Sequence, residues 1–274
     1  GSGPATRIVM DAGDGFAIKL GSRCMVKNFQ LTGTTSAYTP SGGIGNRDGI
    51  IWQGTFTDDG NAPRLSLVSN LIISKFDGGG ITCYDTGTGT SSMIAVENVI
   101  LDRCDVGINI SYYSEYHNFT NCRTSNCWVG CINNGGNNTF VNCNFSSCGG
   151  TAFIMDNQYN QSPNNSHGSC VGCTFNHTAG NTGIGIDVRN CRNGFVFTGC
   201  QIFYSQISLD DAEGIVFSAC NFGNSNCDIV ITGGGAILFA NNMHQAKPPI
   251  TISGNTDTHF VNCYNRTTGE LIIP

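Results

Sequence analysis

The feature that most constrains this chain is a short motif that recurs along it, with a cysteine at its fourth position. The motif reads FTNCRT, FVNCNF, CVGCTF, FTGCQI, FSACNF and FVNCYN, beginning at residues 119, 140, 170, 197, 217 and 260. Successive motif cysteines are 21, 30, 27, 20 and 43 residues apart, and FANNMH divides the last interval, with Asn242 in the cysteine position. Self-similarity with this period indicates stacked structural units, each in contact with its neighbours.

A second pattern accompanies the motif, in which apolar and polar residues alternate. Its segments read GITCYD, GINISY, GCINNG, AFIMDN, GIGIDV, QISLDD, DIVITG and PITISG. The apolar pairs include Ile184 with Ile186, and Ile207 with Leu209. Alternation with a period of two predicts short strands that bury one face.

Composition supports an all-β solenoid. The chain of 274 residues contains 37 glycines, and only 12% of its residues are charged, against about 25% in average proteins. Short runs of Val, Ile, Phe and Thr between Gly/Asn turns favour strands, and the consensus of leucine-rich repeats is absent. We predict a right-handed parallel β-helix, a single-stranded solenoid of about nine rungs, over residues 8–274. Residues 1–7, beginning GSGP, are expected to be a cloning remnant and N-terminal lead-in.

The fifteen cysteines fit the same architecture. Residues in one position of successive rungs stack about 4.8 Å apart, and buried thiols behave as small apolar side chains. The alternative is a metal cluster, but CVGC is a lone pair without a second ligand pair nearby. We predict a reduced cysteine stack, no metal and no cofactor, which suits assembly in a cytoplasm better than secretion.

The net charge of −6 and the absence of a basic stripe argue against a nucleic-acid partner. No apolar run approaches the roughly 20 residues of a membrane span, so no membrane interaction is predicted.

Acidic residues gather in the second pattern. When each segment is aligned by its apolar pair, the residue that follows is Ser111, Asn133, Asp156, Asp187, Asp210, Thr232 and Ser253. Three successive rungs would then place Asp in one outward-facing position, at a cost of roughly 1–3 kcal/mol for each adjacent pair, less in solvent. Such a column either binds a cation or performs acid–base chemistry; the alternative is a solvated polar edge.

Paired carboxylates are what the cleavage of a glycosidic bond requires, one as acid and the other as base or nucleophile. Asp187, Asp210, Asp211 and Glu213 are predicted to group on two adjacent rungs. Arg189 is expected either to pair with Asp211 or to contact substrate.

Two further segments are candidates for binding substrate. NQYNQSPNNSHG, residues 157–168, follows Asp156 and brings Tyr159 and His167 toward the acidic position, although a passive loop is an equal alternative. SYYSEYH, residues 111–117, supplies Tyr112 and Tyr113, with Trp128 expected on the same surface. Aromatic faces stack on sugar rings, but this segment also fits a loop packed on the solenoid's flank.

The rung pattern NGFVFTGCQIF, EGIVFSACNF and DTHFVNCYN, with GIGIDV and QISLDD as the second strand, resembles the β-helical bacteriophage tailspikes of the pectate-lyase-like group. The resemblance implies an endoglycosidase that binds and hydrolyses a bacterial surface polysaccharide, either capsule or O-antigen. It implies Asp187, Asp210 and Glu213 as catalytic residues, with Asp156 and Asp211 in reserve. It also implies a homotrimer in the phage tail of the virion, assembled in the host cytoplasm.

Two other functions remain open at this level. The aromatic segment and the long loop would suffice for a non-catalytic glycan-binding receptor domain. A polysaccharide lyase would need calcium, which Asp156, Asp187, Asp210 and Asp211 are able to hold, and Arg189 as its base.

Overall fold

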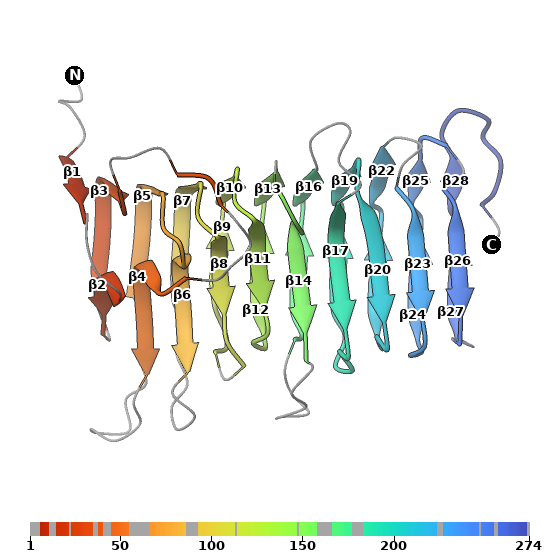
Figure 1. Ribbon diagram of the computed structural model, residues 1–274. Coiled ribbons are helices and arrows are strands. Elements are labelled where there is room, and N and C mark those ends of the chain that lie inside the picture. The colour runs from red at the N-terminus through yellow and green to blue at the C-terminus, as the bar shows by residue number, and fades with distance from the viewer. Residues whose placement is uncertain are drawn as a thin grey trace.

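The computed structural model describes residues 6–10, 15–21, 23–34, 38–40, 45–54, 66–85, 93–112, 114–146, 148–157, 166–176, 183–223, 227–246, 248–254 and 257–272. Every regular element in these ranges is a β-strand. The chain winds as a row of coils, with its N-terminus at one end of the row and its C-terminus at the other (Figure 1). No helix in the described ranges is long and apolar enough to cross a membrane.

Each coil contributes strands to two sheets, one of 18 strands and one of 10, and every pairing between named strands is parallel. The strands that form the long first flank near the N-terminus are β1 (Thr6–Val9), β3 (Met25–Thr32), β5 (Ser66–Ser74) and β7 (Ile94–Asp102). After them this flank divides into two columns of shorter strands. The first column is β9 (Asn118–Thr120), β12 (Asn138–Val141), β15 (Gly168–Val171), β18 (Phe195–Thr198), β21 (Ile215–Ser218), β24 (Ile237–Ala240) and β27 (Thr258–Val261). The second is β10 (Arg123–Ser125), β13 (Asn144–Ser146), β16 (Thr174–Asn176), β19 (Gln201–Phe203), β22 (Asn221–Gly223), β25 (Met243–His244) and β28 (Tyr264–Asn265).

The ten-stranded sheet forms the opposite flank. It consists of β2 (Gly15–Leu20), β4 (Arg47–Gly54), β6 (Gly79–Asp85), β8 (Val106–Ile110), β11 (Val129–Asn133), β14 (Phe153–Asp156), β17 (Ile184–Arg189), β20 (Gln206–Asp210), β23 (Ile229–Thr232) and β26 (Ile250–Ser253). In Figure 1 its strands run downward at the front while the first column returns upward behind, which makes the coil right-handed. The predicted right-handed parallel β-helix of about nine rungs is therefore confirmed, and the described coils give this sheet ten strands.

The cysteine of the motif occupies one interior column, as predicted. Cys122, Cys143, Cys173, Cys200, Cys220 and Cys263 are buried, and each thiol lies 3.3–3.5 Å from a carbonyl oxygen of the preceding coil. Asn242 takes the same position: its Nδ2 donates to the carbonyl of Phe217 at 3.0 Å, and its Oδ1 accepts from the backbone N of Cys220 at 2.8 Å. All fifteen cysteines are free thiols.

The residue before the motif cysteine bends the backbone between the two columns. Asn121, Asn142, Gly172, Gly199, Ala219, Asn241 and Asn262 all have φ of 51–63°, and Asn28, Asn70 and Asn98 do the same within the longer strands. Asn and Gly tolerate this left-handed conformation best. Neighbouring asparagines also donate Nδ2 to Oδ1 along the stack at 3.2–3.3 Å.

Phenylalanines fill the core as two further columns. Phe197, Phe217 and Phe239 stack with ring centroids 4.7–4.9 Å apart, and Cys170 replaces phenylalanine in this column. The other column runs through Phe145 and Phe175 and later reaches Phe222, whose ring stacks on His244 at 4.3 Å.

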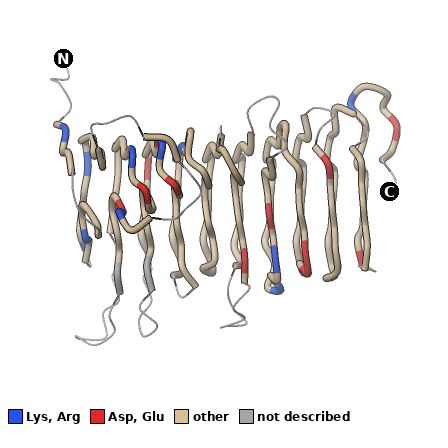
Figure 2. The backbone as a smooth tube through the Cα atoms, in the orientation of Figure 1, with Lys and Arg blue, Asp and Glu red and all other residues tan. Residues whose placement is uncertain are grey.

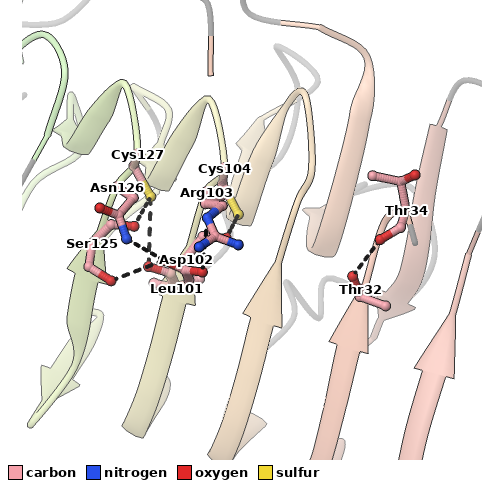
Figure 3. A network of polar contacts seen from close by, with 9 residues as sticks. All are labelled: Thr32, Thr34, Leu101, Asp102, Arg103, Cys104, Ser125, Asn126 and Cys127. Carbon is pink, nitrogen blue, oxygen red and sulfur yellow. Dashed lines mark hydrogen bonds and ion pairs between the residues drawn. The ribbon is translucent and has the colours of Figure 1, made fainter. Parts of the chain in front are cut away.

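Short polar contacts fix the corner where the chain crosses into the ten-stranded sheet. Figure 3 shows Asp102 at this corner, where its Oδ1 accepts from Asn126 Nδ2 at 2.8 Å and from Ser125 Oγ at 3.3 Å. Beside them the thiol of Cys127 donates to the carbonyl of Leu101 at 3.7 Å. These contacts tie one coil to the next at the end of the paired strands β7 and β10, where Ser125 is aligned with Asp102.

Glycines occupy the second position of several strands in the ten-stranded sheet, such as β6, β8 and β11, because a side chain does not fit there. A Cβ on Gly107 would lie 2.5 Å from the carbonyl oxygen of Gly130 and 2.6 Å from Thr124 Cγ2. We therefore expect Gly107→Ala to lower the free energy of unfolding by about 1–3 kcal/mol through overpacking. Gly235, with nothing within 4 Å of its Cβ position, is the matched control. Equal urea midpoints for Gly107→Ala and Gly235→Ala would contradict this packing account.

His244 should make stability depend on pH. It is buried, both ring nitrogens are without a hydrogen-bond partner among the described residues, and burial lowers its pKa to about 4. Because the unfolded side chain titrates near about 6.5, its contribution is intact above that pH and is lost as the pH falls toward 4. His117, whose pKa burial lowers to about 3, acts in the same direction.

We expect His244→Phe, which completes the phenylalanine column, to reduce the loss of unfolding free energy between pH 7 and pH 5. Urea titrations at both pH values measure this loss, with His259→Gln on the exposed surface as the control. An unchanged difference between the two pH values in His244→Phe would show that His244 does not cause it.

Candidate functional site

The carboxylates of interest lie where strands of the ten-stranded sheet end. Backbone pairing aligns Asp156 with Arg189, Arg189 with Asp210, and Asp210 with Thr232. We call this outward position the outer slot. The prediction that Asp187 stands between Asp156 and Asp210 in this slot is wrong, because Arg189 occupies that place.

A bulge explains the displaced register. The pairing of β17 with β20 shifts between Ile184 and Ile186, next to Gly185. Ile186 and Val188, rather than Ile184 and Ile186, are the buried pair that continues the core. This places Asp187 two residues earlier on the same outer face, in line with Ile154 and Ser208.

Asp187 is fully buried although it lies on the outer face. Its Oδ1 accepts from Arg189 Nε at 3.1 Å, and its Oδ2 makes a second, shorter contact with Nη2 of the same guanidinium. The two residues thus form a bidentate pair, the geometry in which Arg–carboxylate contacts are strongest. Asp187 orients Arg189 and is itself screened from solvent.

Arg189 also interacts with the carboxylates on both sides of it. Its Nη1 lies 4.0 Å from Asp156 Oδ2, and the Arg189 side chain is 47% exposed against 20% for Asp156. The hydrogen bonds that Arg189 donates to Asp187, together with the charges of Asp187, Asp156 and Asp210, raise the pKa of Arg189. Asn134, on the preceding coil, fixes Asp156 by accepting its backbone N–H at 2.9 Å.

Asp211 and Glu213 leave this face at the turn after β20. Asp211 has φ of 47°, and its carboxylate pairs with Arg192 at 2.7 Å rather than with Arg189, the alternative that the sequence had left open. Glu213 is exposed and forms an isolated bridge with Gly235. The pKa of Arg192 is raised by the hydrogen bond that it donates to Asp211, with a smaller contribution from the charge of Glu213.

The predicted substrate-binding aromatics do not form one surface. Trp128 lies directly before β11, at the opposite end of the strands from the outer slot, and covers Gly149 and Gly150. Tyr112 is half-buried and follows β8, at the same strand ends as the outer slot. Tyr113 and Tyr159 fall outside the described residues. His167, half-buried, directly precedes β15, and its Nδ1 is buried without a hydrogen-bond partner among the described residues.

Sequence reasoning missed buried polar groups beneath the outer slot. Asn157 and Ser166 each have a buried side-chain oxygen without a hydrogen-bond partner in the described structure. The side chain of Ser166 and the backbone of Asn157 approach Cys191, whose pKa is raised to about 11, mainly by burial. The only sequence signal for them was their position around the long insertion.

Charge is concentrated at this edge. In Figure 2 acidic and basic residues gather along the lower parts of β14, β17 and β20, while the neighbouring coils are largely uncharged. Within the described ranges no group of three or more His, Cys, Asp or Glu has the arrangement of a metal site. The outer slot therefore offers two accessible carboxylates flanking one guanidinium that a buried aspartate orients.

The Asp187–Arg189 pair should contribute measurably to stability. We expect Asp187→Asn to lower the free energy of unfolding by about 1–3 kcal/mol, because a buried hydrogen-bonded charge pair is lost. The control is Asp211→Asn, which breaks an exposed pair and should cost at most about 1 kcal/mol. Urea denaturation measures the free energy of unfolding of both variants. Equal losses in the two would show that the burial of Asp187 does not strengthen its pair with Arg189.

Known protein structures share this fold. The chain superposes on the Dettilon tailspike protein (gp208) with a TM-score of 0.63 and 11% identity, covering 94% of this chain and 60% of that one. It superposes on the catalytic unit of the GH87 α-1,3-glucanase from Streptomyces thermodiastaticus strain HF3-3 with a TM-score of 0.57 and 13% identity, covering 89% and 50%. For pectate lyase Pel9A the values are 0.52 and 12%, covering 92% and 68%.

The chain thus spans about half to two thirds of the length of these structures. No protein-family model matches the sequence, and no curated protein matches it either. The fold is accordingly the parallel β-helix that is also found in a phage tailspike, a glucanase and a pectate lyase.

Proposed function

We propose that this chain is a tailspike-type endoglycosidase that binds and hydrolyses a bacterial surface polysaccharide, capsule or O-antigen. The observation that carries the proposal is the outer slot, where Asp156 and Asp210 flank Arg189 on three consecutive coils. The tailspike and glucanase with the same fold support this substrate class.

The spacing of the two carboxylates favours inversion at the anomeric carbon. Two inter-strand spacings put the Cα atoms of Asp156 and Asp210 about 9.6 Å apart. In inverting enzymes the carboxyl groups are roughly 6.5–9.5 Å apart, which leaves room for a water between base and sugar. The carboxylate of Asp156 leans toward Arg189, and a similar lean of Asp210 would bring the two carboxyl groups into that range. Asp187 is too buried to touch a sugar, so the proposed catalytic residues are Asp156 and Asp210. The role proposed for Asp187 is to position Arg189.

The proposed reaction is a single displacement. One carboxylic acid protonates the glycosidic oxygen as the bond to the anomeric carbon breaks. The other carboxylate takes a proton from the water whose oxygen forms the new bond to that carbon. Arg189, between the two, donates hydrogen bonds to sugar oxygens and holds the ring over the slot.

A lyase mechanism with Arg189 as the base is less compatible with this arrangement. The hydrogen bond that Arg189 donates to Asp187 raises the pKa of Arg189 and so keeps the guanidinium protonated. A base must be able to lose its proton near the working pH.

The same proposal includes a homotrimer in a phage tail. The outer faces of β12, β15, β18, β21 and β24 carry no Lys, Arg, Asp or Glu. Val171 and Val196 on them are 41% and 38% exposed, in line with Thr, Ser and other Val residues. An uncharged sheet face of this kind suits contact between copies of the chain.

We expect Asp156→Asn and Asp210→Asn each to reduce the release of reducing ends from the host polysaccharide at least a hundredfold, since general acid or base catalysis contributes about 10²–10⁴-fold. Asp228→Asn, an acid at the opposite end of β23, is the control and should keep full activity. Melting curves verify that the variants fold.

Undiminished cleavage by both variants would eliminate the outer slot as the active site. Binding without any product would favour a non-catalytic receptor domain, and products with unsaturated-sugar absorbance would identify a lyase. The anomer first released, read by NMR, tests inversion.

A further inference from the structure

We infer that the outer slot takes a polysaccharide segment free of acidic groups, that is, one without uronate, sialate, phosphate or sulfate on the sugars it contacts. This inference rests on the proposed function and specifies its substrate class.

The first step is the distribution of charge along the chain. Residues 124–246 contain six acidic residues and two arginines: Asp156, Asp187, Asp210, Asp211, Glu213, Asp228, Arg189 and Arg192. All but Asp228 lie on β14, β17 and β20 or in the turns that follow β17 and β20. The segments 158–165 and 177–182, which lie between β14 and β17 in the sequence, contain no Lys, Arg, Asp or Glu. The fixed charge of this face is therefore set by these seven residues and is negative.

The second step is that acidic neighbours already engage both arginines. Asp187 holds Arg189 by two contacts, and Asp156 lies 4.0 Å away on its other side. Asp211 holds Arg192 at 2.7 Å. An acidic sugar would have to compete with these carboxylates for each guanidinium. Sites that recognise anions in other proteins instead present arginines that are not already paired with a carboxylate.

The third step is that the remaining charges face solvent. Asp210 and Glu213 are exposed, and Asp156 is 20% exposed. Carboxylates near an anionic polymer repel it, most strongly at low salt. The outer slot also continues into neutral Thr232 and Ser253, whose side-chain hydroxyls are able to donate to and accept from sugar hydroxyl groups. A row of carboxylate, guanidinium and hydroxyl groups matches the hydroxyl, acetamido or amino groups of uncharged or basic sugars.

The test uses matched pairs of probes. A panel of purified bacterial surface polysaccharides includes neutral polymers and uronate-containing ones, and each uronate polymer is also prepared in its carboxyl-reduced form, which keeps the linkages and removes the charge. Binding is measured on the full chain at low and high ionic strength. We expect the reduced form to bind at least tenfold more tightly than its parent at low salt, with a smaller ratio at high salt. Asp211→Asn removes one negative charge and releases Arg192, which lies outside the outer slot, from its ion pair. It should therefore bring the affinities for the reduced polymer and its parent closer together.

Tighter binding of the acidic parent than of its reduced form would overturn the inference and leave the proposed function standing. Failure of every polysaccharide in the panel to bind or be cleaved would instead overturn the proposed function, and the inference with it.

Discussion

The parallel hydrogen-bonded register between successive coils is the constraint on which the rest of this structure depends. It brings residues 20 to 30 positions apart in the sequence to about 4.8 Å from one another. A residue that suits one coil therefore recurs on the next, which produces the columns of cysteine, phenylalanine and left-handed asparagine. Stacked phenylalanines and asparagines contact their own kind, and the cysteine thiols donate to carbonyl oxygens of the preceding coil. Aliphatic side chains of the ten-stranded sheet complete the core.

The same register creates the candidate site from residues that would otherwise be unremarkable. Asp156, Arg189 and Asp210 belong to different coils, and only backbone pairing makes them neighbours. A stack of three aspartates would be repulsive, and the chain avoids it by placing Arg189 in the centre and Asp187 beneath it. Charge balance within the slot thus leaves two accessible carboxylates apart from each other, as a hydrolytic pair requires.

The fold was predictable because the spacing of the repeated motif matches the length of one coil. The same spacing also placed Asn242 correctly in the cysteine column. The site was predictable only to the level of its strands. Ile184, Ile186 and Val188 are apolar at alternate positions, so alternation alone could not choose which pair is buried, and the bulge at Gly185 decided it. In β11 the inward positions are Cys131 and Asn133, so Asn134, not Asn133, lies beside Asp156. Trp128 was misplaced because sequence proximity to the tyrosine segment does not reveal at which strand end a turn lies.

The most direct measurement is a crystal structure of the protein with an oligosaccharide released from a polysaccharide that it binds. This account predicts sugar density over the ends of β14, β17 and β20, with a glycosidic oxygen between the carboxylates of Asp156 and Asp210 and a sugar oxygen within hydrogen-bond distance of Arg189. Sugar bound at another face, such as the Trp128 end of the same strands, with the outer slot empty, would contradict it.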